Sequence, residues 1–149
     1  MVSYIDNAMF NCIVDRSLWT NMLDKKVAVI GEDNPHAIKG SLTQRLIERF
    51  KFQRRNFKIF TKTNRFEAED AEQFDVLVGV RPCNGEIEIL KGATKYEKEF
   101  ILLPCTCECL QVKVLRLIRE YPVIKKIEAY PGQFTDGNFD SRAWIILYN

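Results

Sequence analysis

Residues 74–109 of this chain read FDVLVGVRPCNGEIEILKGATKYEKEFILLPCTCEC. A valine-rich apolar run at Val76–Val80 is followed by turn-forming residues, by a segment with helical spacing from Glu86 to Glu99, and by a second apolar run at Phe100–Leu103. This order predicts a strand–helix–strand unit of a parallel sheet. Neither run alternates with polar residues, so we expect both strands to be buried beneath helices on two faces.

The segments that follow these two strands are the first place to look for function. Ligands of open parallel sheets bind beyond the carboxyl ends of the strands. The first strand ends in Arg81-Pro82-Cys83-Asn84-Gly85, and the second ends in Pro104-Cys105-Thr106-Cys107. We therefore expect a binding crevice at this edge of the sheet.

The chain before residue 74 supplies two more predicted strands. Val27–Gly31 is a short apolar run that predicts a core strand, and residues 56–61 predict a strand nearer the sheet edge. Between them, Ser41 with Gln44 three residues later predicts the start of a helix that runs to Phe52. Residues 63–73 are polar and predict one helical turn at most. A right-handed crossover then places the strand that begins near Asp75 on the far side of the first strand.

The chain after residue 109 predicts a helix that ends at Pro122, a strand at 124–129 and a last strand at 143–148. The connection between these two strands is too short for a helical crossover, so the last strand is expected to be antiparallel. Residues 1–24 predict a helical segment that packs on the sheet. The whole pattern predicts one α/β domain over residues 1–149, with a doubly wound, Rossmann-like sheet that is mostly parallel and has an antiparallel C-terminal strand.

Composition indicates the class of protein and the cellular compartment in which we expect it. The chain has 149 residues, of which 46% are hydrophobic and 28% charged, as in ordinary globular domains. No apolar run is long enough to span a bilayer, and the N-terminus lacks the order of a secretory signal. Five cysteines, an odd number, suit a reducing compartment better than a disulfide framework. We expect a cytoplasmic protein that does not contact membranes; its oligomeric state is left open.

A basic run lies between the first two predicted strands. The net charge of +2 gives no argument for nucleic acid by itself, but a local stripe of cations can follow a phosphate backbone. The alternative is the solvated face of a helix, which the acidic cluster at 67–72 favours. The residues proposed for nucleic-acid contact are Arg45, Arg49, Arg54, Arg55 and Lys58.

The order of predicted elements resembles the class I S-adenosylmethionine-dependent methyltransferases. Their fold is a doubly wound sheet whose last strand is inserted antiparallel. The segment Val78–Cys83, the helix after it and the segment Phe100–Cys105 look like the fourth and fifth strands of methyltransferase-like proteins that carry Gly-Leu-His-Pro-Cys-Gly and a later Val-Pro-Cys-Cys. The topological resemblance covers residues 25–149, and the residue-level match covers residues 74–105.

The resemblance implies a binding site for S-adenosylmethionine at the carboxyl edge of the sheet. It implies cofactor contacts from Gly31, Glu32, Asp33, Thr61 and Val80. It implies substrate placement by Arg81, Pro82, Cys83 and Asn84, where amino-methylating relatives carry Asn-Pro-Pro-aromatic and only Pro82 matches. The chain departs from the family in three places: the first loop has no further glycine nearby, the second strand ends in Thr61-Lys62 instead of an acid, and the third family strand is missing.

Other hypotheses remain open at this stage. The same region also resembles deoxyribosyltransferase-like nucleotide-processing folds, which implies Glu86 or Glu88 as a nucleophile near a helix N-terminus. A cysteine nucleophile at Cys83 or Cys105 would need His36, the only histidine, as its base.

The alternating thiols Cys105, Cys107 and Cys109 are of the kind that bind a soft metal ion, but they lack the paired spacing of zinc sites, so no metal is predicted. A non-catalytic module that binds a protein or nucleic-acid partner is the other alternative.

Overall fold

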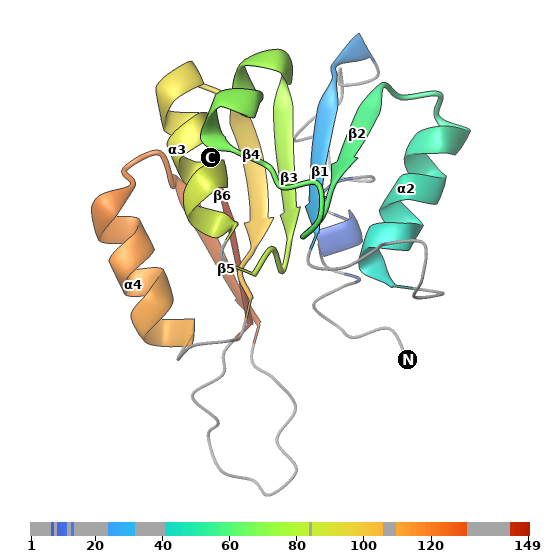
Figure 1. Cartoon of the computed structure of the whole chain (residues 1–149). Helices are drawn as coiled ribbons and strands as arrows, with labels where there is room; N and C mark the ends of the chain where they lie inside the picture. Colours follow the sequence, from blue (N-terminus) through green and yellow to red (C-terminus); the bar gives the residue numbers. More distant parts are fainter. Residues whose placement is uncertain are drawn as a thin grey trace, which may run out of the picture.

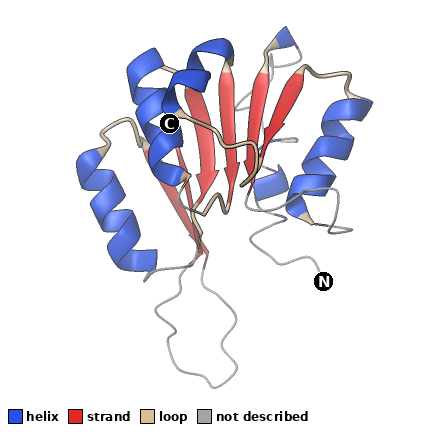
Figure 2. Ribbon diagram, in the orientation of Figure 1, coloured by secondary structure: helices blue, strands red, loops and turns tan. Residues whose placement is uncertain are grey.

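The computed structural model describes residues 7, 9–11, 13, 24–31, 41–83, 85–105, 110–130 and 144–149. These residues form one open sheet with helices on both faces (Figures 1 and 2). The strands are β1 (Val27–Gly31), β2 (Phe57–Phe60), β3 (Val76–Val80), β4 (Glu99–Leu103), β5 (Lys126–Tyr130) and β6 (Trp144–Tyr148). The helices are α2 (Leu42–Phe52), the 3-10 helix η3 (Ala68–Gln73), α3 (Glu86–Tyr96) and α4 (Leu110–Glu120).

The sheet is mixed, with its strands in the order β2-β1-β3-β4-β6-β5. The first four strands are parallel, whereas β6 runs antiparallel to both β4 and β5. β3 lies on the far side of β1 from β2, which confirms the strand order expected from the sequence. The antiparallel last strand is also confirmed, and β2 lies at the sheet edge as expected.

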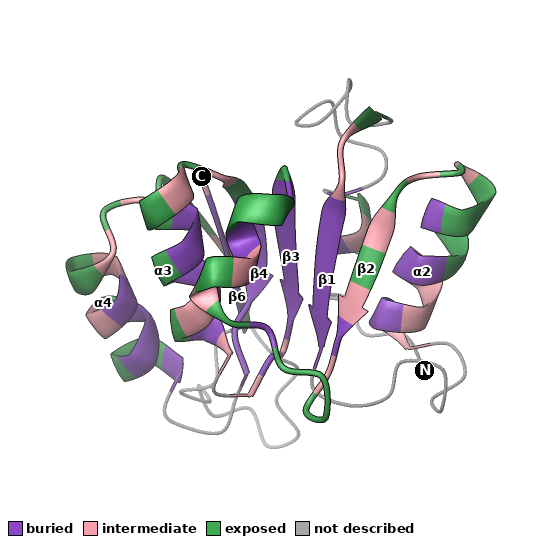
Figure 3. Cartoon of the chain, turned by 45° about the horizontal axis from the view of Figure 1, so that its top comes forward, coloured by how far each residue is buried: buried purple, intermediate pink, exposed green. Residues whose placement is uncertain are grey.

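The two faces of the sheet bury two separate apolar clusters, because alternate residues of a strand point to opposite faces. On β3, Val76 and Val78 contact the cluster under α2, and Leu77 contacts the cluster under α3 and α4. Figure 3 shows the central strands coloured as buried along their length. Burial on both faces explains why β1, β3 and β4 are apolar without polar alternation.

Helix α2 begins where the sequence indicates. The Oγ of Ser41 accepts a hydrogen bond from the backbone N of Gln44 at 3.2 Å, which confirms Ser41 as the N-cap. Leu42, Leu46 and Phe50 are buried against the sheet, as their spacing predicts. The described residues of the N-terminal segment agree with a helix on this same face, since Met9 and Ile13 are helical and buried in the cluster under α2.

The segment between β2 and β3 contains only the 3-10 helix η3, so no described strand occupies the position of the third family strand. Helix η3 lies directly on α3, and Gly92 makes this contact close. A Cβ at residue 92 would stand 2.7 Å from the Cβ of Ala71 and 2.9 Å from the carbonyl oxygen of Ala68. None of the described helices is long and apolar enough to cross a membrane.

Candidate functional site

A cavity of about 340 Å³ opens beyond the carboxyl ends of β1 and β2. Residues from three neighbouring strands or the turns after them reach it, and further walls come from the connection between β2 and η3 and from the start of α3. Its lining consists of Ile30, Gly31, Thr61, Lys62, Arg65, Phe66, Pro82, Cys83, Gly85 and Glu88.

The topology explains why the cavity lies here. β1 pairs in parallel with β2 on one side and with β3 on the other, and Gly31 is level with Val80. The chain leaves β1 toward α2 on one face, but it leaves β3 toward α3 on the opposite face. Connections that diverge in this way leave a crevice at the strand ends. The sequence-based expectation that the strands ending near Ile30 and Val80 lie side by side and point the same way is confirmed, whereas the loop after Gly31 lies outside the described residues.

Four of the site residues predicted from the sequence line this cavity: Gly31, Thr61, Pro82 and Cys83. Val80 does not line it, because its side chain is 5% exposed within the cluster under α2. Arg81 is not part of the lining either. Its backbone has φ 44°, and its N donates a hydrogen bond to the carbonyl oxygen of Leu103 at 2.8 Å, which fixes the turn after β3 against the end of β4. Glu32, Asp33 and Asn84 lie outside the described residues.

Arg65 and Phe66 line the cavity but were not predicted as site residues. Both lie in the polar connection before η3, where no motif singles them out. Phe66 is 5% exposed, and its ring meets Phe60 edge-on with the centroids 5.2 Å apart. The only sequence signal is a single aromatic residue in an otherwise polar segment, which indicates that the segment folds back onto the sheet.

The cavity carries both signs of charge. Lys62 and Arg65 are exposed cations on one wall, and Glu88 is a partly buried acid in the first turn of α3. The Oε2 of Glu88 accepts a hydrogen bond from the backbone N of Ala68 at 2.8 Å, so this side chain is held against η3. A ligand that fits would combine hydrogen-bond donors near Glu88 with an anionic group near the two cations.

A second cluster of polar groups lies behind the cavity, between α3, α4 and the end of β4. Glu86 and Lys113 are only 2% and 6% exposed, and the Nζ of Lys113 lies 3.0 Å from the Oε1 of Glu86. The same Nζ lies 2.8 Å from the Sγ of Cys105 and 3.3 Å from its carbonyl oxygen. The Oε1 of Glu86 also accepts a hydrogen bond from the N of Cys105 at 2.9 Å. This Glu86–Lys113–Cys105 cluster is fully hydrogen-bonded.

Lys113 remains a cation in this cluster. Burial acts to lower the pKa of Lys113, but hydrogen bonds to Cys105 and Glu86 and the negative charge of its neighbours outweigh burial and raise the pKa. The paired ammonium in turn allows Glu86 to be buried, because an unpaired carboxylate would carry a large desolvation cost there.

The two glutamates proposed as nucleophiles therefore have different surroundings. Glu86 is buried and paired with Lys113, and it does not line the cavity, whereas Glu88 does. Cys83 is partly exposed on the cavity and Cys105 is buried. His36, the base that a cysteine nucleophile would need, lies outside the described residues, as do Cys107 and Cys109. Within the described ranges, no three His, Cys, Asp or Glu side chains are grouped closely enough to hold a metal ion.

The basic run from Arg45 to Lys58 is divided by the fold. The guanidinium of Arg45 lies 4.4 Å from the ring centroid of Phe10, and that of Arg55 lies 5.4 Å from that of Phe50. The Nζ of Lys58 lies 5.1 Å from the ring centroid of Phe60, on the face of the sheet opposite α2. Arg49 and Arg54 are exposed near the end of α2. The five residues thus do not share one face.

Comparison with known proteins adds no relative: a family-model scan, a search of curated proteins and a search of solved structures each found no match to this chain.

Proposed function

We propose that this chain is a methyltransferase-like, doubly wound Rossmann-like module that binds S-adenosylmethionine in the cavity beyond β1 and β2. The observation that carries the proposal is the position of this cavity. It lies at the carboxyl ends of parallel strands whose connections diverge to opposite faces, and it is lined by Gly31, Thr61 and Pro82, which the resemblance had assigned to the site.

The sheet supports the same proposal. The last strand, β6, is inserted antiparallel between β4 and β5, which is the feature that the resemblance implies for the methyltransferase fold. The four other strands in the core run parallel in the order β2-β1-β3-β4. This order supports the proposal, although the described residues contain no counterpart of the third family strand.

The lining residues suit the chemical groups of this cofactor. A volume of about 340 Å³ is at the lower end of the range of small-molecule sites. Glu88 offers a carboxylate to the ribose hydroxyls, which replaces the acid missing after the second strand. Lys62 and Arg65 offer positive charge to the carboxylate of the methionine portion, and Phe66 offers an aromatic edge to the adenine. When bound, S-adenosylmethionine supplies a methyl group on a positively charged sulfur.

The contribution of the protein to such a transfer would be placement. Holding donor and acceptor in line removes most of the entropic cost of bringing them together, and little acid–base chemistry is required of the side chains. Pro82 and Cys83 border the cavity on the side of β3 and are positioned to shape the acceptor site. Arg81 would contribute indirectly, because its backbone hydrogen bond fixes the turn that carries Pro82 and Cys83.

The proposal is tested by calorimetric titration with S-adenosylhomocysteine, the product form of the cofactor. We expect binding by the wild-type chain and a loss of roughly tenfold or more in affinity for Glu88→Gln, because hydrogen bonds to a charged acceptor contribute about 1.5–3 kcal/mol. Glu72→Gln, at an exposed position of η3 away from the cavity, is the matched control and should bind as the wild type does. Absence of heat at millimolar ligand, or tighter binding of adenosine triphosphate than of S-adenosylhomocysteine, would count against the proposal.

A second candidate function is binding of single-stranded nucleic acid, and the exposure of Phe52 favours it. This side chain is 82% exposed at the end of α2, beside the exposed cations Arg49, Lys51 and Arg54. Arg54 has φ 55°, a left-handed backbone position that favours glycine. Aromatic rings among cations stack nucleobases and hold phosphates.

This candidate predicts binding of single-stranded RNA or DNA that weakens steeply with salt. Phe52→Ala should weaken binding at every salt concentration, whereas Arg49→Glu with Arg54→Glu should also reduce the salt dependence. Binding that is unchanged in both variants would remove the candidate.

A further inference from the structure

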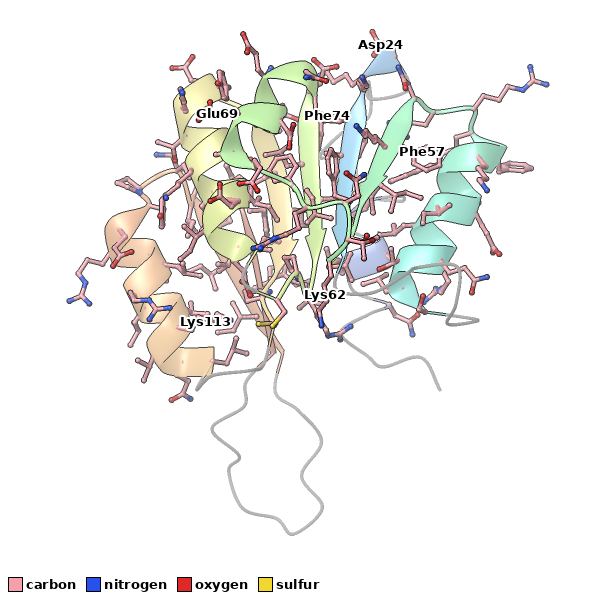
Figure 4. All side chains as sticks on the ribbon, viewed as in Figure 1. Asp24, Phe57, Lys62, Glu69, Phe74 and Lys113 are labelled. Carbon is pink, nitrogen blue, oxygen red and sulfur yellow. The ribbon has the colours of Figure 1, made fainter. Side chains whose placement is uncertain are left out.

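The Glu86–Lys113–Cys105 cluster places a nucleophilic nitrogen and a sulfur in contact inside the protein. The Nζ of Lys113 and the Sγ of Cys105 are 2.8 Å apart, and both residues are less than a tenth exposed. Figure 4 labels Lys113 on α4, which lies beside the sheet near the end of β4. The two residues are eight positions apart in sequence, so their contact depends on α4 folding back over the end of β4.

Ion pairing alone does not require this contact. Glu86 already supplies Lys113 with a carboxylate, and the carbonyl oxygen of Cys105 supplies a second acceptor. The third donor of the ammonium is directed at sulfur. A cation beside a thiol favours the thiolate, which is the form that reacts with peroxides.

We propose that Cys105 and Lys113 form a reversible oxidative crosslink, a sulfenamide bond between Sγ and Nζ, when the protein meets a peroxide. In the first step the thiolate attacks the peroxide, a sulfur–oxygen bond forms and the oxygen–oxygen bond breaks. The departing hydroxide takes a proton from the Lys113 ammonium and leaves as water. The products are a sulfenic acid on Cys105 and a neutral amine on Lys113.

In the second step the neutral amine attacks the sulfur of the sulfenic acid. A nitrogen–sulfur bond forms, the sulfur–oxygen bond breaks, and the hydroxide leaves as a second water after taking a proton from nitrogen. The balance is thiol plus amine plus hydrogen peroxide to sulfenamide plus two waters. Sulfenic acids are known to condense with nitrogen in this way. Two added thiols reverse the bond and are themselves oxidised to a disulfide.

Glu86 makes the crosslinked state distinct from the reduced state. In the reduced protein its carboxylate is paired with a cation, but the crosslink removes that charge and leaves Glu86 with the N–H of Cys105 as a donor. A buried carboxylate without a cation is costly. The crosslink therefore stores free energy at the junction of α3, α4 and β4, and reducing thiols should reverse it readily. This inference does not depend on the proposed function.

Peptide mapping after peroxide treatment of the native protein tests the crosslink. We expect an intact mass lower by two hydrogen atoms, loss of tryptic cleavage after Lys113, and a linked product that joins Cys105 to Lys113. Dithiothreitol should restore both the mass and the cleavage. Lys113→Arg retains the positive charge but lacks the primary amine, so this variant should instead accumulate a sulfenic acid at Cys105 that dimedone traps.

Three results would overturn the proposal. The first is a mass loss that maps to a disulfide between two of the five cysteines, with cleavage after Lys113 intact. The second is oxidation confined to the more exposed Cys83. The third is an unchanged mass and tryptic map of the folded wild-type protein after peroxide treatment. This result would exclude the crosslink even if Lys113→Arg does not fold.

Discussion

Lys113 is buried with its positive charge because its amino group donates hydrogen bonds to acceptors on α3 and just after β4. The apolar spacing of α4 predicts a buried stripe that includes Leu110, Val114 and Leu117, and Lys113 lies beside that stripe. Nothing in the local sequence shows that a lysine there is buried. Its partners come from residues 86 and 105, which only the tertiary fold brings to it.

Lys113→Met should therefore lower the free energy of unfolding by more than the change in side-chain packing alone would. Removing one partner of a buried pair leaves the charge of Glu86 uncompensated, at a cost of about 3–5 kcal/mol. The double change Lys113→Met with Glu86→Gln should recover most of this loss, because the amide oxygen can still accept from the N of Cys105. Urea unfolding measures both variants, and additive losses in the double variant would contradict the account.

Glu69 gives a prediction for pH dependence. Its Oε2 accepts hydrogen bonds from the hydroxyl of Tyr96 at 2.7 Å and from the Nζ of Lys95 at 2.9 Å. The Tyr96 hydrogen bond, followed by the Lys95 contacts, lowers the pKa of Glu69 below its usual 4.5. A lowered folded-state pKa stabilises the fold above pH 4.5, and this contribution is lost as the pH falls through the folded-state value.

Tyr96→Phe should raise the midpoint of the Glu69 carboxyl titration followed by NMR, and Lys95 should keep the midpoint below the usual value. Thr94→Ala, on the same helix but without a bond to Glu69, is the control. A midpoint that does not move in Tyr96→Phe would show that the hydroxyl does not hold the carboxylate.

At the scale of elements, the contact between η3 and α3 depends on a glycine. Gly92→Ala should destabilise the protein, because the added methyl group would meet the Cβ of Ala71 and the carbonyl oxygen of Ala68. Overpacking of this kind costs about 1–3 kcal/mol, which exceeds the gain of about 1 kcal/mol from helix propensity. Lys91→Ala, exposed in the same turn, should change the free energy of unfolding little. A more stable Gly92→Ala variant would contradict the packing described.

The elements that the sequence predicts are those whose signals are local. The apolar runs of β1, β3 and β4, the Ser41 cap and the short connection before β6 each have a direct physical meaning, and each prediction is confirmed. The sequence predicted only some of the residues that line the cavity. Gly31 ends β1 and Pro82 follows β3, so topology could place both, whereas Arg65 and Phe66 reach the cavity from a segment with no periodic pattern. Val80 was placed on the crevice, but the pleat turns its side chain into the core.

At the scale of the whole molecule, the sheet order places an open cavity and a buried charged cluster at the same end of the strands. The cavity between β1, β2 and the start of α3 has charged side chains on its walls, whereas the Glu86–Lys113–Cys105 cluster at α4 is buried and fully hydrogen-bonded. Gly85 belongs to the cavity and Glu86, the next residue, belongs to the buried cluster. The start of α3 thus joins the two sites.

The most direct test of the central claim is where a cofactor analogue binds. We expect titration of the ¹⁵N-labelled protein with S-adenosylhomocysteine to shift the backbone amide signals of Gly31, Thr61 and Gly85 together and with one saturation curve, while amides at the far ends of the strands, such as Val27 and Val76, stay in place. Saturating shifts confined to other surfaces, or no shifts at millimolar ligand, would contradict the claim that this cavity is an adenosyl-cofactor site.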